Sequence, residues 1–261
     1  MLEKVKQPLR DLRELFWTAR DTVRKLLFVR AKKLQRISMG NHLLYTRLAA
    51  HILKANTFTI VDVGANNGWF AHIIYAFDPK AKIVSYEPLL SHEADLQRLA
   101  AANSNFTYRL KAVGERKGRQ TIHESSTSGL SSIKKQLTGV YEESFKTAIV
   151  NEYDVDVVTL DSEFLHEKEK LLIKIDVQGY EMEVLQGAKK LFAKEEIACV
   201  IIELCTTPKY HGQALAPEMI ALLTSYGFEF FDIFPSYYEK SSGQLTEFDA
   251  VFIHKKICQC Q

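Results

Sequence analysis

The sequence predicts an α/β fold built on a mostly parallel sheet, and three observations lead to this prediction. From residue 57 onward, short apolar runs alternate with amphipathic segments of helical period, the pattern of a sheet with helices on both faces. The first apolar run, 58–63, passes through a glycine turn directly into a helix-like segment, as at the start of a nucleotide-type cofactor site. The chain closes with two aromatic-rich strands and no helix between them, which predicts an antiparallel final pair.

Each element after residue 57 follows from its local pattern. Runs rich in aliphatic and aromatic residues predict strands at 58–63, 82–87, 106–113, 155–160, 171–176, 198–204, 228–234 and 248–254. Helical periodicity predicts helices at 69–77, 91–102, 180–193 and 217–225. Residues 115–150 are polar and irregular, with a serine-rich stretch at 125–132, and they predict a long loop of the kind that forms a lid or a binding loop.

Residues 1–55 differ from the rest and predict a basic helical extension in front of one α/β domain at 56–261. Residues 1–40 hold eleven Lys and Arg against four Asp and Glu, a net charge of +7. Because the whole chain has a net charge of +2, residues 41–261 have a net charge of −5. One apolar stripe runs along residues 2–37 at alternating spacings of four and three: Val5, Leu9, Leu12, Phe16, Ala19, Val23 and Leu26.

Three roles remain open for residues 1–37. The stripe packs on the body of the protein, pairs with a second copy to form a homodimer, or lies on an anionic membrane surface. In the membrane alternative the basic side chains face the headgroups: Lys4, Arg10, Arg13, Arg20, Arg24 and Lys25. Nucleic-acid binding is not expected, because the rest of the chain is acidic and has no basic platform with interleaved aromatic residues.

Composition indicates an ordinary globular protein, with 46% hydrophobic and 25% charged residues among 261. No signal peptide is visible, and no apolar run approaches the ~20 residues of a membrane span. A cytoplasmic location is therefore expected, with peripheral attachment to the inner face of a membrane as the alternative. Cys199 and Cys205 are interpreted as buried apolar residues, and Cys258 and Cys260 lie in a tail with too few ligands for zinc, so no metal site is predicted.

Acidic residues beside the glycine turn indicate the kind of cofactor. Gly64 and Gly68 are expected to let the backbone approach a ligand closely, but Asn66 stands where a dinucleotide fingerprint has its second glycine. Glu87 ends the second strand, where a carboxylate can accept both hydroxyls of a ribose. Asp62 would repel a diphosphate but suits an ammonium group. These residues favour S-adenosylmethionine, which has an ammonium, a ribose and no phosphate, over NAD.

An ordered set of motifs resembles the FkbM-type family of S-adenosylmethionine-dependent methyltransferases over residues 57–255. The matching segments are 61–68 (VDVGANNG), 86–88 (YEP), 111–114 (KAVG), 159–161 (TLD), 173–181 (IKIDVQGYE) and 184–188 (VLQGA). Many members have Glu where Gln178 stands. The resemblance implies a Rossmann-like class I methyltransferase fold with seven strands and an antiparallel last strand. It also implies O-methylation, often of a sugar or glycan hydroxyl or of a natural product.

The predicted cofactor residues lie at or near the carboxyl ends of the expected strands, where ligands bind in such sheets. Asp62 and the glycine turn would hold the methionine part, Glu87 the ribose, and the backbone near Val113 the adenine. The full predicted set is Asp62, Gly64, Ala65, Asn66, Gly68, Glu87, Pro88, Ala112 and Val113.

Asp176 is the first catalytic candidate, because it ends a buried strand at the cofactor edge and could orient or deprotonate the acceptor. Its alternative role is to cap the following helix. Glu203 ends the next strand at the same edge and is the second candidate. The predicted acceptor-binding residues are Ser131, Gln178, Glu181 and His211. For Glu181 the alternative is a favourable charge at a helix N-terminus, and for His211 an ordinary surface position.

Two other functions remain alternatives. An NAD(P)-dependent oxidoreductase would share the fold, although Asn66, Asp62 and the lack of a separate substrate domain argue against it. A non-catalytic binding module would keep the fold and use its basic helix for recruitment, but the intact acidic and glycine positions disfavour it.

Overall fold

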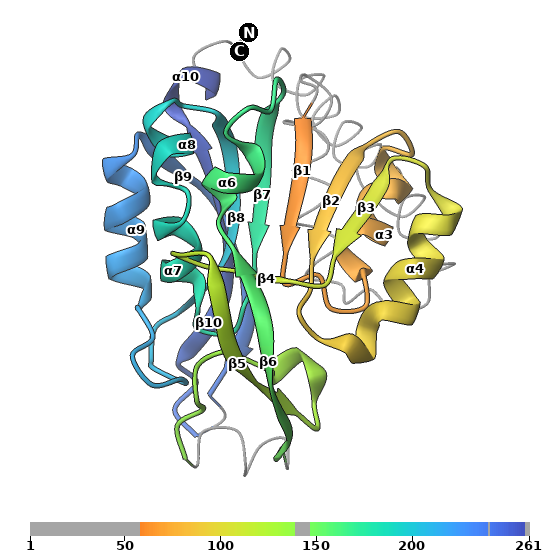
Figure 1. Ribbon diagram of the computed structural model, residues 1–261. Coiled ribbons are helices and arrows are strands. Elements are labelled where there is room, and N and C mark those ends of the chain that lie inside the picture. Colours follow the sequence, from red (N-terminus) through yellow and green to blue (C-terminus); the bar gives the residue numbers. More distant parts are fainter. Residues whose placement is uncertain (1–57, 139–146, 240, 259–261) are drawn as a thin grey trace, which may run out of the picture.

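The computed structural model describes residues 58–138, 147–239 and 241–258, which form two β-sheets with surrounding helices (Figure 1). The larger sheet has seven strands in the order β3-β2-β1-β7-β8-β10-β9, so the predicted α/β sheet is confirmed. Its strands are β1 (Phe58–Val63), β2 (Lys82–Tyr86), β3 (Phe106–Arg109), β7 (Lys170–Ile175), β8 (Ile197–Cys205), β9 (Phe228–Tyr238) and β10 (Leu245–His254).

Strand direction also follows the prediction. β1 is parallel to β2 and β7, and the pairs β2–β3 and β7–β8 are parallel as well. The last strand, β10, lies between β8 and β9 and is antiparallel to both. The large sheet is therefore parallel except for this one inserted strand.

Helices cover both faces of the large sheet because its central strands are apolar on both sides. In β1, Val61 and Val63 belong to one core, and Phe58 and Ile60 belong to the other. On the first face pack α6 (Leu160–Phe164), α7 (Glu181–Gln186), α8 (Lys189–Ala193) and α9 (Ala216–Ser225). On the second face pack α3 (Trp69–Phe77) and α4 (Glu93–Ala102), and α10 (Lys255–Cys258) follows β10.

A second, three-stranded sheet extends past the carboxyl ends of the central strands (Figure 1), and the sequence analysis did not predict it. Its order is β4 (Ala112–Val113), β6 (Ile149–Val158), β5 (Gly118–Ser125). Three expectations are corrected: 106–113 forms two strands, 155–160 overlaps the end of β6 in the small sheet, and the predicted loop 115–150 contains β5 and the start of β6. β5 gave no signal because its first four residues are exposed, which leaves little apolar alternation.

Residues 180–193 form two short helices, α7 and α8, where the sequence predicted one. At Gly187, between them, a Cβ atom would lie 2.1 Å from the carbonyl oxygen of Gly114, so two backbone segments touch there. The interruption between α7 and α8 lies at this contact.

The predicted basic helical extension at 1–55, with its alternatives of packing, dimerisation and membrane contact, lies outside the described residues. Among the helices that the structure describes, none combines the length and apolar character that a membrane crossing requires.

Candidate functional site

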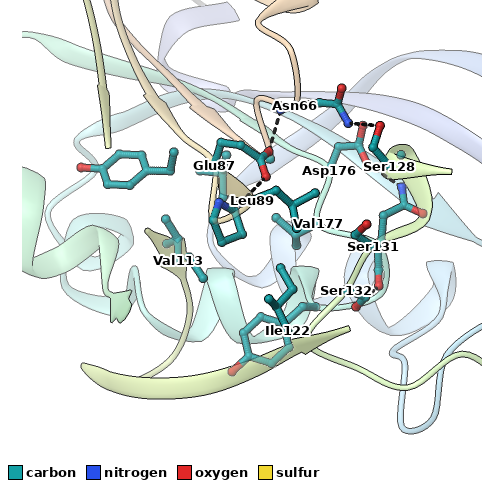
Figure 2. Close-up of a pocket in the computed structure, with 18 of the residues that line it drawn as sticks. Asn66, Glu87, Leu89, Val113, Ile122, Ser128, Ser131, Ser132, Asp176 and Val177 are labelled. Carbon is teal, nitrogen blue, oxygen red and sulfur yellow. Dashed lines mark hydrogen bonds between the residues drawn. The ribbon is translucent and has the colours of Figure 1, made fainter. Parts of the chain in front are cut away.

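A cavity of about 570 Å³ opens at the carboxyl edge of the large sheet (Figure 2). Its wall comes from the glycine turn after β1, the ends of β2 and β7, strand β4, and the segment after β5. This is the edge at which open α/β sheets bind ligands. The predicted site residues that line it are Gly64, Asn66, Glu87, Pro88, Ala112, Val113, Ser131, Asp176 and Gln178.

The turn between β1 and α3 has left-handed backbone at three positions. The φ angle is 81° at Gly64, 50° at Asn66 and 80° at Gly68, which glycine and asparagine tolerate best. A Cβ atom at Gly64 would lie 1.8 Å from the carbonyl oxygen of Asp176, and one at Gly68 would lie 2.9 Å from Leu99. Close contact with neighbouring protein segments therefore requires glycine at these two positions. The prediction from the sequence was that close approach of a ligand requires it.

Glu87 follows β2 and presents its carboxylate to the cavity. Its Oε2 accepts a hydrogen bond from the backbone N–H of Asn66 (2.7 Å), and its Oε1 accepts one from Leu89 (2.9 Å) (Figure 2). Glu87 is 4% exposed, and burial raises its pKa to about 7. Each carboxylate oxygen has a further lone pair, so this fixed group can still accept hydroxyl donors from a ligand.

Asp62 faces Lys174 and does not line the cavity. It is completely buried, accepts a hydrogen bond from Ser85 Oγ (3.3 Å), and places Oδ1 3.7 Å from Nζ of Lys174. Burial raises the pKa of Asp62, and the Lys174 cation opposes that shift. Nζ of Lys174 also donates to the carbonyl oxygen of Gly64 (3.0 Å). The structure thus places Asp62 behind the turn, where Lys174 lies between it and the carbonyl oxygen of Gly64.

Asp176 follows β7 and borders the cavity (Figure 2). Its side chain is 25% exposed, its Oδ2 lies 3.3 Å from Lys174 Nζ, and its Oδ1 accepts from Nε2 of Gln178 (2.8 Å). The same Nε2 donates to Oε2 of Glu203 (2.9 Å). Burial and neighbouring carboxylates raise the pKa of Glu203 well above its ordinary value. Gln178 thus joins the two predicted catalytic candidates, and of these two only Asp176 lines the cavity.

The segment after β5 forms another part of the wall and includes the short helix η3 (Ser128–Leu130). Ser128 Oγ accepts from Nδ2 of Asn66 (3.5 Å), and Ser131 Oγ accepts from the backbone N–H of Ser125 (3.0 Å). Ser132 Oγ donates to the backbone carbonyl of Gln178 (2.7 Å). The serine-rich segment is therefore an ordered wall, and the acceptor-binding role of Ser131 stays a prediction.

Four further predicted residues lie away from the cavity wall. Ala65 and Gly68 are buried within the turn, and His211 is exposed after β8. Glu181 is 5% exposed, and its Oε1 accepts from the backbone N–H groups of Val177 (3.1 Å) and Gly179 (3.0 Å). Burial raises the pKa of Glu181 to about 7. His211 thus lies at a surface position, as in its alternative role. Glu181 is the first residue of α7 and binds the backbone that precedes this helix, whereas its predicted alternative was a favourable charge at the helix N-terminus.

The cavity also contains residues that the sequence analysis did not single out. They come from α3, β5, η3 and the residue before α7: Trp69, His72, Ile122, Ser128 and Tyr180. Lys174 does not line the cavity, but it was also missing from the predicted site residues. A lysine inside a buried apolar strand indicates a buried ion pair. Its partner on β1 could be identified only once the strand register was known.

The groups around the cavity suit an adenosyl cofactor that carries an amino acid. Glu87 offers a buried acceptor for hydroxyl groups, and Leu89, Val113 and Ile122 add apolar surface for a flat ring. Within the described ranges, no group of three or more His, Cys, Asp or Glu side chains is arranged to hold a metal ion.

Comparison with known proteins places these features in context. The family model of the methyltransferase FkbM domain matches residues 62–230. A magnesium protoporphyrin IX methyltransferase from Synechocystis PCC 6803 with bound S-adenosylmethionine is 10% identical, with 87% of this chain and 91% of that chain covered and a TM-score of 0.44. An rRNA methylase from Streptococcus thermophilus is 10% identical, with 84% and 98% covered and a TM-score of 0.45. A structure of WbdD with a kinase inhibitor is 12% identical, with 84% and 41% covered and a TM-score of 0.49. No curated protein matches the sequence.

Proposed function

Because the chain belongs to the FkbM methyltransferase family, we propose that it transfers a methyl group from S-adenosylmethionine to a hydroxyl oxygen of a sugar, a glycan or a natural product. The observation that carries this proposal is that the carboxylates of Glu87 and Asp176, each held by hydrogen bonds within the protein, line the same cavity. They follow β2 and β7, the two strands that flank β1. One carboxylate is buried for binding, and the other is partly exposed for contact with an acceptor.

In this proposal the cofactor occupies the part of the cavity nearest the glycine turn. Glu87 accepts the two ribose hydroxyls, which is the contact that an acidic residue after the second strand makes in such folds. The backbone of Gly64 and Asn66 holds the amino acid part, and Ala112 and Val113 line the adenine. Lys174 supports this arrangement from behind by binding the carbonyl oxygen of Gly64.

The bound cofactor supplies a methyl group that its sulfonium centre has already activated. The chain must then hold the acceptor oxygen in line with that methyl group and receive the hydroxyl proton. Asp176 has the required position, because its carboxylate borders the cavity while Lys174 and Gln178 hold both of its oxygens. By accepting a hydrogen bond from the acceptor hydroxyl, Asp176 turns a lone pair of that oxygen toward the methyl group.

The other residues that line the cavity favour an acceptor with hydroxyl groups. Ser128 and Ser131 offer hydroxyl groups, Asn67 offers an amide, and Trp69 offers an aromatic surface in the same cavity. A few polar groups beside an apolar face are typical of sites that bind small polar ring compounds.

Calorimetric titration of the purified protein with S-adenosylmethionine, S-adenosylhomocysteine and NAD tests the cofactor assignment. We expect micromolar binding of the two sulfur compounds, no binding of NAD, and at least tenfold weaker binding after Glu87→Ala. The control is Glu93→Ala, which removes an exposed carboxylate on α4. Binding of NAD alone would reject the proposal.

Transfer of a tritiated methyl group to a panel of methyl glycosides and hydroxylated macrolides tests the acceptor class. Asp176→Asn should lower kcat by roughly 100-fold or more while the affinity for S-adenosylhomocysteine stays within about threefold. Ser131→Ala should raise the KM of the acceptor more than that of the cofactor. Methylation of amine acceptors only would contradict transfer to oxygen.

A further inference from the structure

Gln178 is the point at which four parts of the protein meet. Its side chain contacts Asp176 after β7 and Glu203 on β8, and it also contacts Tyr210 in the segment after β8. Its backbone carbonyl accepts from Ser132, in the segment after β5. The φ angle of Gln178 is 56°, a left-handed conformation that non-glycine residues rarely adopt. Strained backbone of this kind persists where the surroundings fix it, often beside a functional site.

Tyr210 fixes which way the Gln178 carboxamide points. Its hydroxyl lies 3.0 Å from Oε1 of Gln178 and donates to it. The Nε2 end therefore faces Asp176 Oδ1 (2.8 Å) and Glu203 Oε2 (2.9 Å), two acceptors that both need a donor. A carboxamide has two N–H groups, so each carboxylate receives one.

These bonds complete the restraint on Asp176. Lys174 Nζ donates to Oδ2 of Asp176, and Gln178 Nε2 donates to Oδ1. Together these two hydrogen bonds fix the orientation of the Asp176 carboxylate at the cavity. Rotation of the carboxylate would break a hydrogen bond on each side.

The same network reaches the serine-rich wall. The Tyr210 hydroxyl also lies 3.2 Å from the carbonyl oxygen of Leu130, so its one proton is shared between this oxygen and Oε1 of Gln178. The Tyr210 ring would contact a Cβ atom at Gly179 at 2.8 Å. Ser132 binds the backbone of Gln178 directly. The position of residues 128–132 and the orientation of Asp176 thus depend on the same side chains.

We infer that Gln178 is a positioning residue: its carboxamide aligns Asp176 for the acceptor oxygen and couples that alignment to the wall formed by residues 128–132. This inference rests on the proposed function, because it gives Asp176 a role in methyl transfer. It assigns Gln178 a contact with Asp176, where the sequence suggested only a contact with the acceptor.

In this chain an amide stands where many members of the family have Glu, and the charges near Gln178 decide what a carboxylate would meet there. The ionisable groups around Asp176 and Glu203 come from several neighbouring elements: Asp62 on β1, Lys174 on β7, Glu203 on β8, Glu247 and Asp249 on β10, Glu181 on α7, and Lys209 after β8. Lys174 and Lys209 are the cations among them, and Lys209 forms an ion pair with Glu247. A carboxylate at position 178 would place a further negative charge between Asp176 and Glu203. Repulsion among the three carboxylates would make this cluster bind a proton more readily.

The geometry can be tested without an acceptor. In the ¹⁵N–¹H spectrum, the side-chain amide protons of Gln178, assigned by their loss in Gln178→Glu, should exchange with solvent at least tenfold more slowly than those of the exposed Gln120. In Tyr210→Phe this protection should fall, because Oε1 of Gln178 then loses the hydrogen bond from the Tyr210 hydroxyl. Equal exchange at Gln178 and Gln120 in the wild type would overturn the inference.

The kinetic test compares three variants on the methyl glycoside that the wild-type enzyme methylates. Gln178→Glu keeps the shape and removes the donors, Tyr210→Phe removes only a hydroxyl, and Gln120→Glu makes the same chemical change as the first at an exposed site on β5. Gln178→Glu should lower kcat by about tenfold to 100-fold with little change in cofactor affinity, and it should shift the acid limb of the kcat profile to higher pH. Tyr210→Phe should lower kcat less, and Gln120→Glu should match the wild type.

The outcomes separate the inference from the function on which it rests. If wild type binds neither sulfur compound, the proposed function fails, whatever the exchange experiment shows. If wild type binds and transfers methyl groups while Gln178→Glu keeps its kcat and pH profile, only the inference fails. Should Gln178→Glu not fold, Tyr210→Phe decides alone, and an unchanged kcat in that variant overturns the inference.

Discussion

Nζ of Lys174 lies 3.7 Å from Oδ1 of Asp62, and both side chains are almost completely removed from solvent. The two residues are register partners on the adjacent strands β7 and β1. Burial raises the pKa of Asp62 while the cation lowers it, whereas the neighbouring acids hold the pKa of Lys174 above its ordinary value. This ion pair therefore joins β1 and β7, in the centre of the large sheet, next to the glycine turn that follows β1.

Lys174→Met should destabilise the protein by about 3–5 kcal/mol, because it leaves a buried carboxylate without its cation. Guanidinium unfolding at pH 7.5 measures this loss. Without the cation, the pKa of Asp62 in the folded state lies further above its unfolded value, so the loss should shrink as pH falls and Asp62 binds a proton. The double variant with Asp62→Asn should recover much of the stability. A double variant as unstable as Lys174→Met would contradict this account.

Glu87 should make cofactor binding depend on pH. Ribose hydroxyls donate to the ionised carboxylate, and burial raises the pKa of Glu87 to about 7. Affinity for S-adenosylhomocysteine should therefore be full above about pH 7 and fall by up to about tenfold per pH unit below it. Glu87→Gln should bind about 10–100-fold more weakly at pH 8 and show a flatter profile. Calorimetry between pH 5.5 and 8.5 gives both profiles, and parallel slopes would show that another group titrates.

Glu181→Gln should stabilise the protein at pH 8. Both backbone donors of Val177 and Gly179 bind the same oxygen, Oε1, which glutamine retains. Burial raises the pKa of Glu181 to about 7, above its ordinary value, so the folded state binds more protons and loses stability as pH rises from about 4.5 to 7. The gain should be about 1–3 kcal/mol at pH 8 and near zero at pH 4.5. Exposed Glu93→Gln is the control, and a destabilised Glu181→Gln at pH 8 would disprove the prediction.

Gly187→Ala should destabilise the protein by about 3 kcal/mol through overpacking. The added Cβ atom would meet the carbonyl oxygen of Gly114 at 2.1 Å, and neither backbone segment can move freely. Gly129 has no neighbouring atom within 4 Å of the same added atom, so Gly129→Ala should stay within about 0.5 kcal/mol of wild type. Thermal unfolding of both variants provides the comparison.

The central strands of the large sheet were predictable because they bury apolar residues on both faces. β1 and β7 are nearly uninterrupted apolar runs, and the aromatic final pair lacks a helix, so even the antiparallel strand could be anticipated. The small sheet was not predictable, because the first half of β5 faces solvent and shows no alternation.

The site was predictable where a residue ends a strand, as Glu87 and Asp176 do, because the edge of the sheet follows from strand order. Contacts between side chains on different strands were not predictable. The pairing of Asp62 with Lys174 depends on register, and the contact of Tyr210 with Gln178 joins residues 32 positions apart. The direction of Glu181 depends on local backbone that periodicity does not describe.

The insertion of β10 between β8 and β9 has a consequence for biosynthesis. A ribosome makes β8 and β9 before β10, and neither can complete its hydrogen bonds until residues 245–254 have emerged. Until then β9 has no partner strand, and Phe230 lacks Phe252, the ring of β10 on which it packs. Unpaired strand edges of this kind favour association with other chains. The nascent protein therefore exposes an unpaired strand edge from the time β9 is made until β10 emerges and inserts beside it.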